Sequence, residues 1–136
     1  MTARQAKRRK RAPHRRKSVL VVDDEAGTID VLIAVLADAG YKTHGAANGR
    51  EALTKLAASS PDLVLLDYVM PVLDGADTLR AIRDDRRLAE TPVVMMSGIP
   101  ESMIKRRCRG YDAFLRKPFS LEELMGTVEK LLERVH

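Results

Sequence analysis

The sequence predicts an α/β protein whose parallel sheet is covered on both faces. Four short apolar runs, at residues 19–22, 63–66, 93–96 and 113–115, indicate buried strands because they are continuous and do not alternate with polar residues. Segments with helical spacing separate them, and this alternation builds a parallel sheet. A chain of 136 residues, 45% of them hydrophobic, is long enough for one compact domain.

The first half of the chain gives two strand and helix pairs in order. After the strand at 19–22, apolar residues at helical spacing over 29–36 predict a helix that ends before Gly40. Residues 41–46 indicate a weaker strand, Asn48-Gly49 a turn, and residues 50–58 a second helix.

In the second half, Asp74-Gly75 opens the third helix and a short helix follows Pro100. The last helix is the clearest, because Ser120 and Glu123 have the spacing of a capping box. Its expected apolar face contains Leu121, Leu124, Met125, Val128, Leu131, Leu132 and Val135.

Charge divides the chain into two parts. Residues 1–17 contain nine Lys or Arg and no acidic residue; subtracting these nine from the total of 24 leaves 15 basic against 19 acidic residues, a net charge of −4. The segment has too few apolar residues to offset its ordering entropy. We therefore predict a disordered basic tail over residues 1–17 and a domain over 18–136.

Several classes of protein are not indicated. No apolar run approaches the length of a membrane helix, and the basic N-terminus lacks the apolar core of a signal peptide, so we expect a cytoplasmic protein with no membrane contact. The single cysteine, Cys108, cannot form an internal disulfide, and a packing role is expected. The three histidines lack the spacing of metal ligands.

Polar side chains follow the predicted strands where each one ends. Asp67 comes directly after residues 63–66, and parallel strands bring all such groups to one edge of the sheet, where open α/β folds keep their chemistry. Singly, each group has an ordinary alternative as a turn or cap residue. Together they indicate a site. The other members are Asp23, Asp24 and Glu25 after the first run, Ser97 after residues 93–96, and Arg116, Lys117 and Pro118 after the last run.

This ordered set resembles the receiver domains of two-component response regulators over about residues 18–136. The resemblance implies a doubly wound, five-stranded parallel sheet in the flavodoxin-like order 2-1-3-4-5 with helices on both faces. The motifs that carry it are Val21-Val22-Asp23-Asp24-Glu25, Asp67 with Met70-Pro71 and Asp74-Gly75, Ser97-Gly98, and Lys117-Pro118-Phe119.

The resemblance implies that Asp67 accepts a phosphoryl group in the presence of Mg²⁺. Asp24, Asp67 and the backbone carbonyl of Val69 would contact the metal, with Asp23 acting through water. Hard Mg²⁺ prefers oxygen ligands and keeps several waters, which suits a carboxylate cluster. Phosphoryl transfer needs positioning and charge neutralisation more than covalent chemistry.

Three further residues receive roles by the same resemblance. Lys117 would pair with Asp67 and later with a phosphoryl oxygen, and its bond to Pro118 is expected to be cis. Ser97 would donate its hydroxyl to the phosphoryl group. Phe114, three residues before the lysine, would turn inward when Ser97 moves and so report phosphorylation on the surface.

The chain departs from the family pattern in two places. The interval from Ser97 to Lys117 is about two residues shorter than is common, so the fourth helix should be short or shifted. The same interval has an unusual run of basic residues, which predicts a basic output surface with an acidic partner or, equally, an ordinary solvated face. That run contains Lys105, Arg106, Arg107 and Arg109.

The second departure concerns the residues two positions beyond Asp67 and Ser97. These are Val69 and Ile99, both apolar, where relatives often have polar side chains that influence attack by water. We therefore predict slow autodephosphorylation.

The preferred function is a stand-alone switch that accepts a phosphoryl group from a histidine kinase or phosphotransfer protein and acts by contact with an unknown output protein. Two alternatives stay open. One is a shuttle that passes its phosphoryl group to a histidine phosphotransfer protein. The other is nucleic-acid binding through the Arg4–Lys17 tail, whose cations could release counterions. Catalysis would be limited to self-phosphorylation and autodephosphorylation, so an enzyme is not expected.

Overall fold

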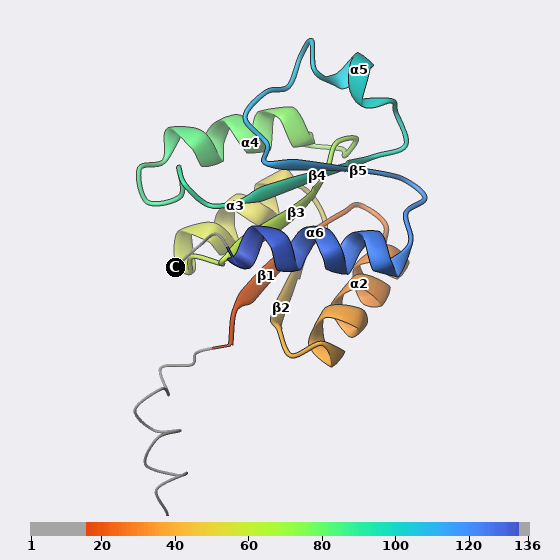
Figure 1. Cartoon of the computed structure of the whole chain (residues 1–136). Coiled ribbons are helices and arrows are strands. Elements are labelled where there is room, and N and C mark those ends of the chain that lie inside the picture. The colour runs from red at the N-terminus through yellow and green to blue at the C-terminus, as the bar shows by residue number, and fades with distance from the viewer. Residues whose placement is uncertain (1–15, 134–136) are drawn as a thin grey trace, which may run out of the picture.

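The computed structural model describes residues 16–133 and confirms the predicted α/β architecture. Five parallel strands lie side by side in the order β2-β1-β3-β4-β5, as the resemblance implied (Figure 1). The strands are β1 (Ser18–Val22), β2 (Lys42–Ala46), β3 (Leu63–Asp67), β4 (Val93–Ser97) and β5 (Ala113–Arg116).

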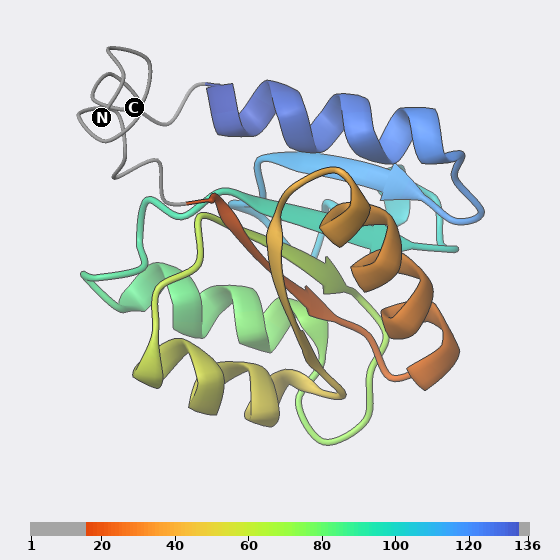
Figure 2. The same cartoon turned by 90° about the horizontal axis from the view of Figure 1, so that it is seen from below.

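Helices cover both faces of this sheet. Helices α2 (Ala26–Asp38) and α6 (Leu121–Glu133) lie on one face, and α3 (Gly49–Ala58) and α4 (Gly75–Asp84) lie on the other (Figure 2). Helix α5 (Glu101–Ile104) has only four residues, in agreement with the short helix expected after Ser97, and Ile104 packs it on the α3 and α4 side.

The strands β1, β3, β4 and β5 contribute side chains to both cores, whereas the edge strand β2 contributes only Ala46 to the core under α3 and α4. In β1, Leu20 and Val22 enter the core under α3 and α4, whereas Val19 and Val21 enter the core under α2 and α6. Successive strand side chains point to opposite faces, so a sheet covered twice needs apolar residues at every position. This explains the continuous apolar runs of the sequence.

Helix ends agree with the sequence in one case and correct it in another. The capping box of α6 is confirmed: Glu123 N donates to Ser120 Oγ at 3.0 Å, and Ser120 N donates to Glu123 Oε1 at 3.2 Å. The turn predicted at Asn48-Gly49 is wrong, because Asn48 is the N-cap of α3 and accepts from Glu51 N at 2.8 Å. An asparagine serves turns and N-caps equally well, and only the hydrogen bond distinguishes them.

One expected core residue of α6 is exposed. Leu121 was predicted on the apolar face but is 54% exposed, because it lies in the first turn, where it lines a surface hollow with Val31 and Phe119. Val135 and the tail predicted over residues 1–17, apart from Arg16 and Lys17, fall outside the described residues. Within residues 16–133, the helices are all too short or too polar to cross a membrane.

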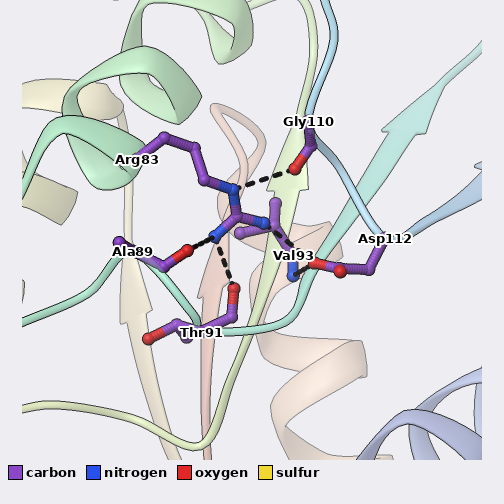
Figure 3. Close-up of polar contacts among 6 residues, drawn as sticks. All are labelled: Arg83, Ala89, Thr91, Val93, Gly110 and Asp112. Atoms are coloured by element: carbon purple, nitrogen blue, oxygen red, sulfur yellow. Dashed lines mark hydrogen bonds and ion pairs between the residues drawn. The ribbon is translucent and has the colours of Figure 1, made fainter.

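Arg83 fastens the end of α4 to the loops around β4 and β5 (Figure 3). Its Nε donates to the carbonyl of Gly110 at 2.9 Å, and its Nη1 donates to the carbonyls of Ala89 at 3.1 Å and Thr91 at 2.7 Å. Its Nη2 pairs with Asp112 at 2.8 Å. One guanidinium thus satisfies backbone acceptors from two separate loops, which its planar set of donors allows.

We expect Arg83→Met to lower the free energy of unfolding by about 2 kcal/mol, because the substitution keeps the aliphatic stem but leaves partly buried carbonyls without a donor. Urea denaturation measures this loss. The matched control is Arg80→Met on the same helix, where an exposed pair with Asp77 should contribute less than about 0.5 kcal/mol. Equal losses in the two variants would contradict a specific role for Arg83.

Candidate functional site

The carboxyl ends of four adjacent strands bring the sequence-predicted site residues to one edge of the sheet. Asp23 follows β1, Asp67 ends β3, Ser97 ends β4, and Lys117 follows β5. Backbone hydrogen bonds continue the sheet past its ends, since Lys117 N donates to the Ser97 carbonyl at 2.8 Å. The Lys117-Pro118 peptide bond is cis, as expected.

Lys117 bridges two buried carboxylates. Its Nζ lies 2.7 Å from Asp23 Oδ2 and 3.3 Å from Asp67 Oδ1. Asp23 has no exposed surface and Asp67 is 6% exposed. A second oxygen of Asp23 accepts from Glu25 N at 3.0 Å, which fixes the orientation of this carboxylate. One ammonium therefore partly neutralises two acids that have little access to water.

Asp23 also belongs to a group of three acids. Ligand atoms of Asp23, Asp24 and Glu25 lie within 4.8 Å of one another. Glu25 was not among the predicted metal ligands, although it is the third acid in the sequence run. In the structure, Glu25 is the N-cap residue of α2, but its side chain makes no capping hydrogen bond. Its carboxylate is therefore available to the acidic group, which the sequence alone does not show. Asp67 is not part of this group and is held by Lys117.

The electrostatics of Asp67 show an excess of negative charge. Burial raises the pKa of Asp67 to about 7, the charges of Asp23 and Asp24 act in the same direction, and Lys117 opposes them. Burial acts to lower the pKa of Lys117, but its hydrogen bond to Asp23 and the charge of Asp67 raise the pKa overall. A hard divalent cation would relieve the excess, so the donor set fits Mg²⁺.

Ser97 and Phe114, the two residues expected to respond to phosphorylation, contact other groups in this structure. Ser97 is 1% exposed, and its Oγ accepts from Ile99 N at 2.9 Å. Phe114 is partly buried and lies 6.2 Å from Tyr111 between ring centroids. The hydroxyl of Ser97 is thus tied to the loop that leads into α5, and the switch role of Phe114 stays a prediction.

The loop after Asp67 is held closely against α4. Gly75 N donates to the Tyr68 carbonyl at 2.9 Å, and a Cβ on Gly75 would come within 2.5 Å of the Asp67 carbonyl oxygen. Only glycine permits this approach. In the same loop, Val72 has φ 71°, a strained conformation for a β-branched residue. Val69 is 58% exposed, and metal contact by its carbonyl stays a prediction.

The strand order 2-1-3-4-5 in a parallel sheet defines a flavodoxin-like fold. The carboxylates and the lysine at its carboxyl edge form an acidic site that is compatible with a metal ion. Residues 19–129 match the family model described as the response regulator receiver domain. The chain therefore belongs to the response regulator receiver family.

Curated relatives agree with this assignment. The chain is 41% identical over 120 residues to Response regulator Rre1 of Synechocystis sp., covering 86% of this chain and 52% of the relative. It is 32% identical over 120 residues to the phosphate regulon transcriptional regulatory protein PhoB of Pseudomonas aeruginosa, covering 87% of this chain and 52% of that relative. The chain spans about half the length of these curated relatives.

Solved structures show the same fold. Chemotaxis protein CheY4 of Vibrio cholerae is 33% identical with a TM-score of 0.78, covering 85% of this chain and 98% of that one. Response regulator protein TrrA of Thermotoga maritima, solved in complex with Mg(2+)-BeF, is 31% identical with a TM-score of 0.77, covering 85% of this chain and 98% of that one.

The raised pKa of Asp67 predicts a pH-dependent stability. Between the ordinary pKa of 3.8 and about 7, the folded protein binds this proton more tightly than the unfolded chain, so the contribution of Asp67 to stability falls as pH rises. In metal-free protein, Asp67→Asn should therefore be more stable than wild type at pH ~8, on the order of 1–2 kcal/mol, and equal to it near pH ~4.

Urea denaturation in the presence of a chelator, at both pH values, measures the difference in unfolding free energy between Asp67→Asn and wild type. Added Mg²⁺ should reduce this difference at pH ~8 because it stabilises wild type. The control is Glu90→Gln, which removes an exposed carboxylate from the loop before β4, at the end of that strand opposite to Ser97. A difference between Asp67→Asn and wild type that is the same at both pH values would contradict the buried-charge explanation.

Proposed function

We propose that this receiver accepts a phosphoryl group on Asp67 from a histidine kinase or phosphotransfer protein and signals by contact with an output protein. The observation that carries the proposal is the Lys117 ammonium shared by two buried carboxylates, Asp23 and Asp67. A lone strand-end aspartate needs no such partner. The arrangement suits a carboxylate that is converted to an acyl phosphate and later hydrolysed back to the free carboxylate.

Asp67 is the nucleophile of this proposal. One of its carboxylate oxygens attacks the phosphorus of the donor phosphohistidine, an acyl phosphate bond forms, the phosphorus–nitrogen bond breaks, and the imidazole leaves with the electron pair and takes up a proton. Lys117 favours the ionised carboxylate before transfer and is near enough to pair with a phosphoryl oxygen afterwards. Ser97 would exchange its contact with Ile99 N for a bond to the phosphoryl group.

Mg²⁺, when bound, would supply positive charge to the transferred oxygens. We propose that Asp24, Asp67 and the Val69 carbonyl hold it, with Asp23 acting through water; Glu25 adds a further carboxylate beside them. The relative TrrA, solved in complex with Mg(2+)-BeF, supports this proposal.

The output of the switch is protein contact in this proposal. Phe114 would turn inward on phosphorylation and change the surface around β5 and α5. Receiver domains are signalling proteins, and we propose that catalysis here is limited to self-phosphorylation and autodephosphorylation in the cytoplasm. Transfer onward to a phosphotransfer protein uses the same chemistry in reverse.

Intact-mass spectrometry after incubation with acetyl phosphate tests the phosphoacceptor. We expect a single phosphoryl adduct that requires Mg²⁺ and that is absent from Asp67→Asn. Asp77→Asn, which removes an exposed carboxylate from α4, serves as the control and should retain the adduct. An adduct that persists in Asp67→Asn would assign the phosphoacceptor to another residue.

The apolar side chains of Val69 and Ile99 predict slow loss of the phosphoryl group. A Val69→Asn, Ile99→Glu double variant should lose it several-fold faster, because polar side chains at these positions can orient an attacking water. The decay of the phosphorylated mass after removal of acetyl phosphate measures the rate. Equal decay in wild type and the double variant would contradict the prediction, and Val72→Asn controls for a change elsewhere in the Asp67 loop.

A further inference from the structure

A basic loop, defined here as residues 105–110, follows α5. Four of its residues are cations, all exposed, and the one apolar residue between them, Cys108, is 3% exposed. Within residues 16–133, these four cations form no ion pair with a carboxylate. The cations are Lys105, Arg106, Arg107 and Arg109.

The acids nearest in sequence contact other residues of the domain. Glu101 stands four residues before Lys105, the spacing of a helical ion pair, but its carboxylate accepts from the Tyr111 hydroxyl at 2.8 Å. Asp112 accepts from Arg83 Nη2 and from Val93 N, each at 2.8 Å. An ordinary solvated face mixes charges of both signs, whereas here Asp112 pairs with Arg83 and Glu101 is oriented toward the Tyr111 hydroxyl. Among residues 16–133, no carboxylate pairs with the four cations, which leaves them accessible to an external group.

The basic loop is also fixed in place. Ile104 and Cys108 are buried in the core, and the Ile104 carbonyl accepts from Arg107 N and Cys108 N, each at 2.9 Å. At the other end, Arg83 holds the Gly110 carbonyl at 2.9 Å, and Figure 3 shows this bond beside the bonds to Asp112. A fixed backbone lowers the entropy cost of binding.

Apolar surface adjoins these cations. A shallow hollow of about 380 Å³ is lined by Lys105, Cys108, Arg109, Gly110 and Tyr111. The hollow can seat an apolar side chain between two cations. Met103, on α5, is 63% exposed. Exposed Met and Arg are typical of protein interfaces, whereas a nucleic-acid backbone gains nothing from an apolar hollow.

We propose that the basic loop binds an acidic segment of a partner protein that inserts one apolar side chain into the hollow. The proposal deepens the proposed function by naming the chemistry of its output partner, and it rests on that function for its signalling role. The binding itself requires no phosphoryl group.

The test uses the full chain and a short fluorescein-labelled peptide of Asp and Glu with one central Leu, followed by fluorescence anisotropy at about 0.15 M salt. The loop variant replaces all four cations of the basic loop with Gln. Because residues 1–17 could also attract the peptide, a matched variant replaces four cations there with Gln: Lys7, Arg8, Arg9 and Lys10.

We expect the loop variant to bind about tenfold more weakly than wild type, and the matched variant to stay within about twofold. Replacing Asp and Glu of the peptide by Asn and Gln should abolish binding, and replacing its Leu by Gly should weaken binding to wild type. Equal losses in the two variants, no binding by wild type, or no effect of the Leu would overturn the proposal. Tighter loop-dependent binding of a duplex DNA would overturn the choice of partner.

Two controls separate folding and phosphorylation from binding. The substituted side chains are exposed, so the thermal unfolding midpoint of the loop variant should match wild type. If it does not, Lys105→Gln with Arg109→Gln, the two cations that line the hollow, repeats the test with less change. The acetyl-phosphate adduct is measured on the same samples: its absence from wild type would refute the proposed phosphoacceptor, while the peptide result would stand on its own.

Discussion

The ammonium group of Lys117 lies between two buried carboxylates, 2.7 Å from Asp23 and 3.3 Å from Asp67, and the site is arranged around this shared ion pair. Burying two acids costs several kcal/mol each unless a cation and hydrogen bonds compensate. One lysine compensates only in part, which leaves the pKa of Asp67 at about 7. The remaining negative charge makes the edge receptive to a divalent cation, and Asp24 and Glu25, which follow Asp23 after β1, add two more carboxylates beside it.

The backbone around this ion pair is held from two sides. On one side, Gly75 lets α4 approach the Asp67 loop closely, while Val72 stores strain in that loop. On the other side, the hydroxyl of Ser97 is bonded to Ile99 N at the entrance to α5. A movement of the Ser97 hydroxyl toward Asp67 would therefore break this bond and release the backbone of Ile99, in the segment that leads to the basic loop. Rigid packing turns such local shifts into discrete changes of surface.

The short α5 shapes the surface beside the basic loop. A four-residue helix supplies few internal hydrogen bonds, so its position depends on Ile104 in the core, on the bond from Tyr111 to Glu101, and on Arg83 at the far end of the loop. The contacts that hold the segment also involve its two flanking acids, Glu101 with Tyr111 and Asp112 with Arg83. Within residues 16–133, the same contacts therefore fix the backbone and direct these acids away from the four cations.

The sequence by itself determined the strands, their parallel arrangement and the four strand ends, because continuous apolar runs and the residues that follow them are local signals. The capping box of α6 is equally local. Only the tertiary structure decided that Lys117 bonds Asp23 more closely than Asp67, that Glu25 joins the acidic group, and that Leu121 is exposed. These outcomes depend on the register of neighbouring strands and on the packing of elements distant in sequence. The pKa of Asp67 follows from burial, which no spacing of residues specifies.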